Sequence, residues 1–175
     1  MAKPIVLTAG HSDIDPGAVG NGQTEANIVR ELRNIVANKL RGAGHRVITD
    51  GEPASNKPLR DAIALIPQGR VAVELHCNAA ANPAAGGVET IALPRDKALA
   101  QRLSAAVARV LGIKVRGDRG WIDQSQSARG KLGYVSAGGL ILEGFFLSNP
   151  AEMAVYQARK WLVAQAIADV LQEVA

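Results

Sequence analysis

Short apolar segments rich in β-branched residues recur along the chain, separated by turn-forming residues. Such segments are typical of strands buried on both faces of a sheet. The pattern predicts strands over residues 5–8, 45–49, 70–76, 87–93 and 139–146. Pro94 directly follows the fourth segment and favours an edge position for that strand, because proline cannot donate to a ladder.

Helical periodicity fills the intervals between these strands. Apolar positions three and four residues apart predict helices over residues 24–42, 59–66, 96–111 and 150–171. Thr24 is a candidate N-cap for the first helix, and Asn149-Pro150 opens the last. Strands that alternate with helices in this way are typical of the α/β class.

Residues 116–133 lack such periodicity and are rich in glycine, serine and glutamine. A structureless stretch of this length is uncommon inside a compact domain and is often functional, a solvated loop being the alternative. The stretch carries four cationic residues, which suit the binding of carboxylates. These are Arg116, Arg119, Arg129 and Lys131.

Length and composition indicate one globular domain with a sizeable core, since the 175 residues are 47% hydrophobic. No apolar run approaches the roughly 20 residues needed to cross a bilayer, and no signal peptide is recognisable, so synthesis in the cytoplasm is expected. The single cysteine, Cys77, excludes an internal disulfide. A net charge of +4 favours anionic partners, but 3% aromatic residues and no Lys/Arg run argue against nucleic acid.

Two histidines stand at the ends of predicted inner strands. His11 follows the first strand, and His76 ends the third. Ligands of open α/β folds bind at the carboxyl ends of strands, so both histidines are candidate site residues. His45, next to Gly44 at the start of a strand, is predicted to be structural. Cys77 faces the side of its strand opposite to His76 and is expected to be a buried, small hydrophobe.

Two glutamates complete the candidate chemistry. Glu25 lies in the first turn of a helix, where the dipole favours an acid and where its carboxylate can also point back at His11. Glu143 lies inside an apolar strand, where an acid is costly unless it is partnered or functional, which favours a functional role. Two histidines and one glutamate are a ligand set of catalytic zinc, with a fourth position left for water.

Five blocks of sequence, taken together and in order, carry a likeness to a known family. They are Gly10 to Ala18 (GHSDIDPGA), Glu25, Glu74 to Ala79 (ELHCNA), Gly87 to Thr90 (GVET) and Leu142 to Asn149 (LEGFFLSN). The chain resembles the zinc-dependent N-acetylmuramoyl-L-alanine amidases of the amidase-3 type, which include phage endolysins. The likeness spans nearly the whole chain.

The chain departs from the family's pattern at a few positions. Ser12-Asp13 replaces a glycine pair, Glu74 replaces a small residue, and Phe145 stands where glycine is usual. None of these changes removes a candidate ligand. They bear on the shape of the loop and on substrate preference.

The resemblance implies a single catalytic domain over residues 1–175, with a twisted, mostly parallel mixed sheet of about six strands flanked by helices, the phosphorylase/hydrolase-like architecture. It implies that His11, Glu25 and His76 bind Zn²⁺ and that Glu143 is the catalytic acid/base. The implied reaction is hydrolysis of the amide between N-acetylmuramic acid and the L-alanine of the stem peptide in peptidoglycan. A monomer without nucleic-acid partners or stable membrane insertion is expected.

The setting predicted from these features is a phage endolysin that lyses its host, made in the cytoplasm and released to the periplasmic wall through a holin. A cytoplasmic recycling enzyme is the alternative setting. For the activity itself, the alternatives are another zinc peptidase or amidohydrolase of cell-wall recycling, or a non-catalytic wall-binding module on the same fold. The presence of all three ligands together with Glu143 argues against the silent module.

Overall fold

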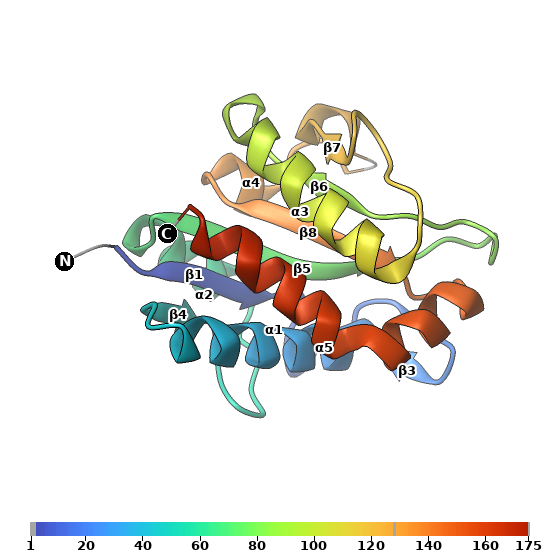
Figure 1. The fold of residues 1–175 in the computed structure, drawn as a ribbon, viewed down its shortest axis with the longest axis horizontal. Helices are drawn as coiled ribbons and strands as arrows, with labels where there is room; N and C mark the ends of the chain where they lie inside the picture. Colours follow the sequence, from blue (N-terminus) through green and yellow to red (C-terminus); the bar gives the residue numbers. More distant parts are fainter. Residues whose placement is uncertain (1–2, 128, 175) are drawn as a thin grey trace.

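A six-stranded sheet forms the centre of the computed structural model, which describes residues 3–127 and 129–174 (Figure 1). The order of strands is β4-β1-β5-β8-β6-β7. The first four strands in this order are parallel, β6 runs antiparallel to β8, and β7 is parallel to β6. The strands span Ile5–Ala9 (β1), Val47–Thr49 (β4), Val71–Asn78 (β5), Glu89–Ile91 (β6), Trp121–Ile122 (β7) and Leu140–Phe146 (β8). The predicted α/β class and mostly parallel, mixed sheet are confirmed.

Helices cover both faces of this sheet: α1, α3 and α5 lie on one face, and the short helices α2 and α4 lie on the other (Figure 1). The helices span Glu25–Gly42 (α1), Leu59–Leu65 (α2), Lys97–Leu111 (α3), Gly133–Ser136 (α4) and Pro150–Gln172 (α5). The described chain also contains three 3₁₀ turns, which span Ile66–Gln68, Pro94–Asp96 and Gln124–Gln126. Strands β2 (Val19–Gly20) and β3 (Gln23–Thr24) form a separate hairpin. Since both faces are covered, all five residues of β1 are buried, which explains its unbroken apolar sequence.

Helix α1 begins where the sequence predicted, and its cap places Glu25 in the first turn. The Thr24 hydroxyl accepts a hydrogen bond from the Asn27 amide at 3.3 Å. The buried face of the helix packs its aliphatic side chains into the larger core, where each contributes about 1.5–3 kcal/mol by leaving water. The core therefore fixes the axis of α1, and the cap fixes the end that carries Glu25.

A buried ion pair supports the end of β1, and the sequence offered no sign of it. Arg33 of α1 contacts Asp50 at 2.8 Å, and neither side chain is exposed. Both oxygens of Asp50 accept the Ala9 amide at 3.2 Å, while Asn56 Nδ2 donates to the carbonyls of Ala9 and Gly10. Burial raises the pKa of Asp50 to about 6, although Arg33 lowers it. This network holds the backbone from which His11 projects.

The prediction that the fourth strand lies at an edge is wrong. Strand β6 is paired on both sides, with β8 and with β7. Pro94 does not interrupt this pairing, because it begins a 3₁₀ turn beyond the end of β6. The proline marks the end of the strand rather than its place in the sheet.

The stretch over residues 116–133, which lacks periodicity, is not entirely without regular structure. The stretch contains β7 and a 3₁₀ turn and reaches the first residue of α4. Gly120 adopts a φ of 99° where its carbonyl accepts the Thr90 amide at 2.7 Å. A strand of two residues is too short for an apolar period, so pairing with β6 decides its conformation.

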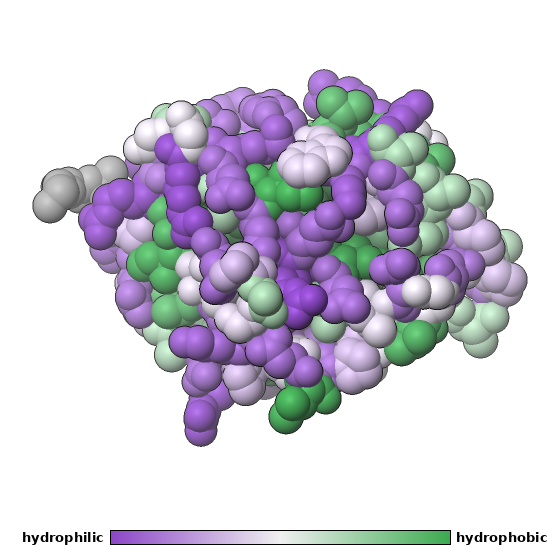
Figure 2. Space-filling model, turned by 90° about the horizontal axis from the view of Figure 1, so that it is seen from below, coloured by the Kyte–Doolittle hydropathy of each residue, from purple (hydrophilic) through white to green (hydrophobic). Residues whose placement is uncertain are grey.

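The face of the molecule seen in Figure 2 is mostly hydrophilic, with hydrophobic residues in small, separate groups. Large hydrophobic side chains that are exposed include Ile14, Val19, Leu59, Val115, Trp161 and Leu162. Among the residues that the structure describes, no helix has the length and apolar character required to cross a bilayer.

Candidate active site

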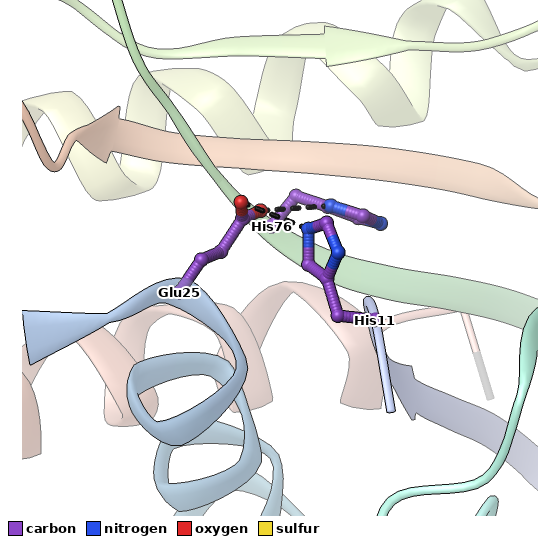
Figure 3. Close-up of side chains that lie close together, drawn as sticks. All are labelled: His11, Glu25 and His76. Carbon is purple, nitrogen blue, oxygen red and sulfur yellow. Dashed lines mark hydrogen bonds and ion pairs between the residues drawn. The ribbon is translucent and has the colours of Figure 1, made fainter. Parts of the chain in front are cut away.

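Three side chains from separate elements meet above the carboxyl ends of β1 and β5 (Figure 3). His11 follows β1, Glu25 is the first residue of α1, and His76 lies near the end of β5. The Glu25 carboxylate bridges the two rings, with Oε2 at 2.8 Å from His11 Nε2 and Oε1 at 2.9 Å from His76 Nδ1. One ligand atom of each residue lies within 4.8 Å of the others. The structure thus brings together the three predicted ligands.

Two glycines leave room for the imidazole rings. A Cβ on Gly10 would lie 2.1 Å from the ring of His76, and a Cβ on Gly17 would lie 2.5 Å from the ring of His11. His11 itself has a φ of 67°, a left-handed conformation that is uncommon for residues other than glycine. Backbone strain of this kind gathers at functional sites, where the surrounding structure enforces it.

The Glu25 carboxylate is fixed by backbone as well as by the histidines. It accepts hydrogen bonds from the Cys77 amide at 3.0 Å and from the Ala18 amide at 3.1 Å. Burial on its own raises the pKa of Glu25, but the hydrogen bonds to both histidines, the charge of His76 and the Cys77 amide together outweigh burial and hold the pKa well below its usual range. The carboxylate is therefore ionised at neutral pH.

Both imidazoles in turn favour positive charge. Burial lowers the pKa of each histidine. Interactions with Glu25 and Asp15 outweigh burial for His11, and interactions with Glu25 and Glu74 outweigh it for His76. Both pKa values are therefore raised. A buried, anionic donor set that stabilises positive charge suits a cation.

The donor set fits zinc. Two imidazole nitrogens and a carboxylate are typical of a catalytic zinc site, and three protein ligands leave one position open. Metal-binding histidines usually donate their second nitrogen to a carboxylate or carbonyl. His11 has such a partner, because its Nδ1 lies 3.1 Å from Asp15 Oδ2.

Glu143 lies beside this cluster on β8. It is the register partner of His76 on one side and of Glu89 on the other. Its Oε2 atom is buried and has no hydrogen-bond partner within the described parts of the chain. Burial is the main reason that the pKa of Glu143 is raised to about 7; Glu25 and Glu89 raise it further, while the two histidines lower it. Such a carboxyl group is suited to accept and return a proton near neutral pH.

Of the four cationic residues of the 116–133 stretch that were expected to suit carboxylates, Arg116 contacts the strands beside the cluster. Its Nε is paired with Glu89 Oε2, and its guanidinium lies 5.0 Å from the centre of the Phe146 ring. Glu89 Oε1 also accepts a hydrogen bond from Asn78 Nδ2 at 3.0 Å. Arg119 instead faces Asp118 of its own loop, and Arg129 and Lys131 are exposed.

The two other predictions about chemistry concern Cys77 and His45. Cys77 is buried in the larger core, and burial raises the pKa of its thiol, as expected of a small hydrophobe. His45 donates its backbone amide to Leu40, at the end of α1 remote from Glu25. The structure keeps His45 outside the cluster.

Sequence analysis missed three acidic residues of this region as site residues: Asp15, Glu74 and Glu89. Strand alternation gave a signal for Glu74, because residues two apart share a face of a strand and His76 was already a candidate. Glu89 is an acid inside a predicted apolar strand, the same signal that identified Glu143. Asp15 lies in a loop, where no periodicity applies.

A parallel sheet with two histidines and a glutamate gathered at its strand ends defines an α/β protein with a candidate metal centre. Comparison with known families agrees with this class of protein and identifies the family within it. The family model described as N-acetylmuramoyl-L-alanine amidase (Amidase_3) matches residues 5–173, and the chain belongs to this family.

Individual relatives show the same likeness. A structure from Neisseria meningitidis, provisionally assigned as an N-acetylmuramoyl-L-alanine amidase, is 44% identical with a TM-score of 0.90, over 98% of this chain and 94% of that one. The catalytic domain of CwlV, an N-acetylmuramoyl-L-alanine amidase from Bacillus (Paenibacillus) polymyxa, is 25% identical with a TM-score of 0.84, over 98% and 97%. The amidase LytC of Bacillus subtilis is 25% identical over 97% of this chain.

The curated relatives are much longer than the region they share with this chain. The matched regions amount to 28% of a Staphylococcus aureus relative and 35% of LytC. The likeness therefore concerns about a third of each of these proteins.

Proposed function

We propose that this protein hydrolyses the amide bond between N-acetylmuramic acid and the L-alanine of the stem peptide in peptidoglycan, with zinc held by His11, Glu25 and His76. The observation that carries the proposal is the carboxylate of Glu143, whose buried Oε2 has no partner in the described chain and lies on the strand beside the three ligands. Family membership supplies the reaction, since the matching model is described by this activity.

Bound zinc supplies two effects: it polarises the scissile carbonyl and lowers the pKa of water to about 7. Glu143 accepts the proton of the attacking water on its free carboxylate oxygen. It then passes that proton to the leaving amine of L-alanine, so that the amine departs neutral. Burial raises the pKa of Glu143 to about 7, and this balances its two tasks as base and acid at neutral pH.

The stem peptide carries carboxylates, and we propose that Arg116 binds one of them. Its guanidinium lies against Phe146 at the end of β8, three residues beyond Glu143, and the side chain is 37% exposed. The pair with Glu89 uses Nε and leaves both terminal nitrogens to donate.

Arg116→Gln is expected to raise KM about tenfold, because a hydrogen bond to a charged group contributes ~1.5–3 kcal/mol and this one is partly open to solvent. The change in KM should exceed any change in kcat. The matched control is Arg119→Gln, whose partner is Asp118 in its own loop. Steady-state kinetics on a soluble muropeptide measure both constants. An unchanged KM for Arg116→Gln would show that Arg116 does not bind the substrate and has only a structural role.

Purified peptidoglycan tests the activity. We expect suspensions of sacculi to lose turbidity on addition of the protein, with newly freed amino groups of L-alanine and no new reducing ends. A chelator should stop the reaction and added zinc should restore it. Binding to sacculi without freed amines would instead support a wall-binding module, and amines of another residue would support a different peptidase.

The proposed setting is that of a phage endolysin acting on the periplasmic wall after release through a holin, with a recycling enzyme as the alternative. The mild positive charge supports action on intact, anionic wall polymer. The same amine assay distinguishes the two settings. An endolysin should cleave intact sacculi at a rate comparable to soluble muropeptides, whereas a recycling enzyme should cleave only the soluble fragments.

A further inference from the structure

Another buried carboxylate, besides those of Glu25 and Glu143, lies against the cluster on the far side of His76. Glu74 precedes His76 by two residues on β5, so both side chains project from the same face of the strand. Only 2% of Glu74 is exposed, and its Oε1 lies 3.1 Å from His76 Nε2. We propose that Glu74 is a positioning residue that orients His76 for metal binding, an inference that rests on the proposed metal site.

The ring of His76 is held at both nitrogens. Nδ1 faces Glu25 and the cluster at 2.9 Å, while Nε2 faces Glu74. A neutral imidazole carries one proton, and an ionised carboxylate can only accept. A metal-bound imidazole is neutral, so the Glu74 carboxylate at Nε2 would hold the one remaining proton there and leave Nδ1, which faces the cluster, to bind the metal. Because Gly10 has no side chain, there is room for the His76 ring beside it.

Glu74 is itself held in position from the next strand. Its Oε2 lies 3.4 Å from the Thr8 hydroxyl of β1, which lies 3.0 Å from the hydroxyl of Tyr134 in α4. Thr8 and Tyr134 are both buried. The three side chains connect α4 to His76 along one face of the sheet, so the carboxylate has little freedom to move away from the ring.

The other candidate histidine ligand provides an internal comparison. The far nitrogen of His11 also contacts a carboxylate, that of Asp15, at 3.1 Å. The Asp15 side chain is 62% exposed, whereas that of Glu74 is 3% exposed. Because water weakens charge interactions, the buried carboxylate should affect its histidine more strongly. Glu74 should therefore matter more than Asp15 for metal affinity.

Zinc affinity of the full chain, measured by competition with a chromophoric chelator, tests this role. Loss of a carboxylate that orients a metal-binding histidine typically costs about 10–100-fold in affinity, and we expect this range for Glu74→Ala. Glu74→Gln should lose at least threefold but less than Glu74→Ala, because an amide oxygen still accepts from Nε2 without the charge. Asp15→Ala should lower the zinc affinity less than Glu74→Ala does. Melting curves establish that each variant is folded, and Glu74→Gln decides the matter if Glu74→Ala does not fold.

The matched control is Glu152→Gln, the same change at another buried glutamate. Glu152 accepts the amides of Gly87 and Phe146 at 2.7 and 2.8 Å, so its two carboxylate oxygens hold backbone rather than a candidate metal ligand. Its variant should melt at lower temperature with zinc affinity unchanged. A Glu74→Gln variant with wild-type zinc affinity, or one no weaker than Glu152→Gln, overturns the positioning role.

The experiment also separates this inference from the proposed function. If the wild-type protein does not bind zinc, the proposed metal site fails and the role of Glu74 fails with it. If the wild type binds zinc and His76→Ala does not, while the Glu74 variants bind as tightly as the wild type, only the role of Glu74 is overturned.

Discussion

Replacing Glu143 with glutamine is expected to lower the rate of amide cleavage by about 10²–10⁴-fold, the typical contribution of a positioned acid/base. Glutamine keeps the size of the side chain but cannot take the proton of the attacking water. The buried Oε2 of Glu143 has no partner to lose among the described residues, so the fold should tolerate the change. The measurement is the rate at which amines of L-alanine appear from purified peptidoglycan.

Three readouts should stay at wild-type values in Glu143→Gln: the melting temperature, the zinc content and cosedimentation with sacculi. The matched control is Glu31→Gln, whose carboxylate pairs with Lys160 on the exposed side of α1 and should leave the rate unchanged. Near-normal cleavage by Glu143→Gln would falsify the proposed mechanism. Loss of zinc from this variant would instead show that Glu143 is a zinc ligand.

Replacing His11 or His76 with alanine is expected to remove both zinc and activity. Metal analysis of the wild-type protein should find about one zinc per chain, as for a mononuclear site. Each histidine supplies one of three ligands, and the ligands come from three separate elements, so the two that remain cannot complete the site. Zinc content of each purified variant, measured by elemental analysis, should fall to a small fraction of the wild-type value.

His45→Ala is the matched control for this pair, because His45 lies at the end of α1 remote from Glu25. It should retain full zinc content and activity. Loss of zinc from His45→Ala together with its retention in His76→Ala would show that the ligand set is wrong.

The longer elements could be predicted from the sequence because each satisfies a local rule. Helices α1, α3 and α5 and strands β1, β5 and β8 lie where the apolar period indicated, since each buries a face or both faces along its own length. Strand β7 and helix α4, of two and four residues, are too short for any period. Pairing with β6 forms the first, and packing against α2 and β8 supports the second.

Part of the candidate site followed from the same reasoning. Parallel strands end at one edge, and in the structure Ala9 is the register partner of Leu75, which brings the residues that follow them together. His11 and His76 could therefore be placed at one edge from sequence. The direction of Glu25 could not, because it depends on the path of residues 12–24 through the turn at Asp13-Ile14, the left-handed backbone of Gly17 and the β2–β3 hairpin.

The sequence by itself determined the kinds of elements and the chemical identity of the candidate ligands, since periodicity and residue type are local properties. The tertiary structure alone decided that Glu25 bridges His11 and His76, that Glu143 keeps an oxygen without a partner among the described residues, and that Arg116 rather than Arg119 contacts Glu89. Each of these contacts depends on side-chain direction, strand register or loop path. Those quantities are set by packing between segments distant in the chain, and no local pattern encodes them.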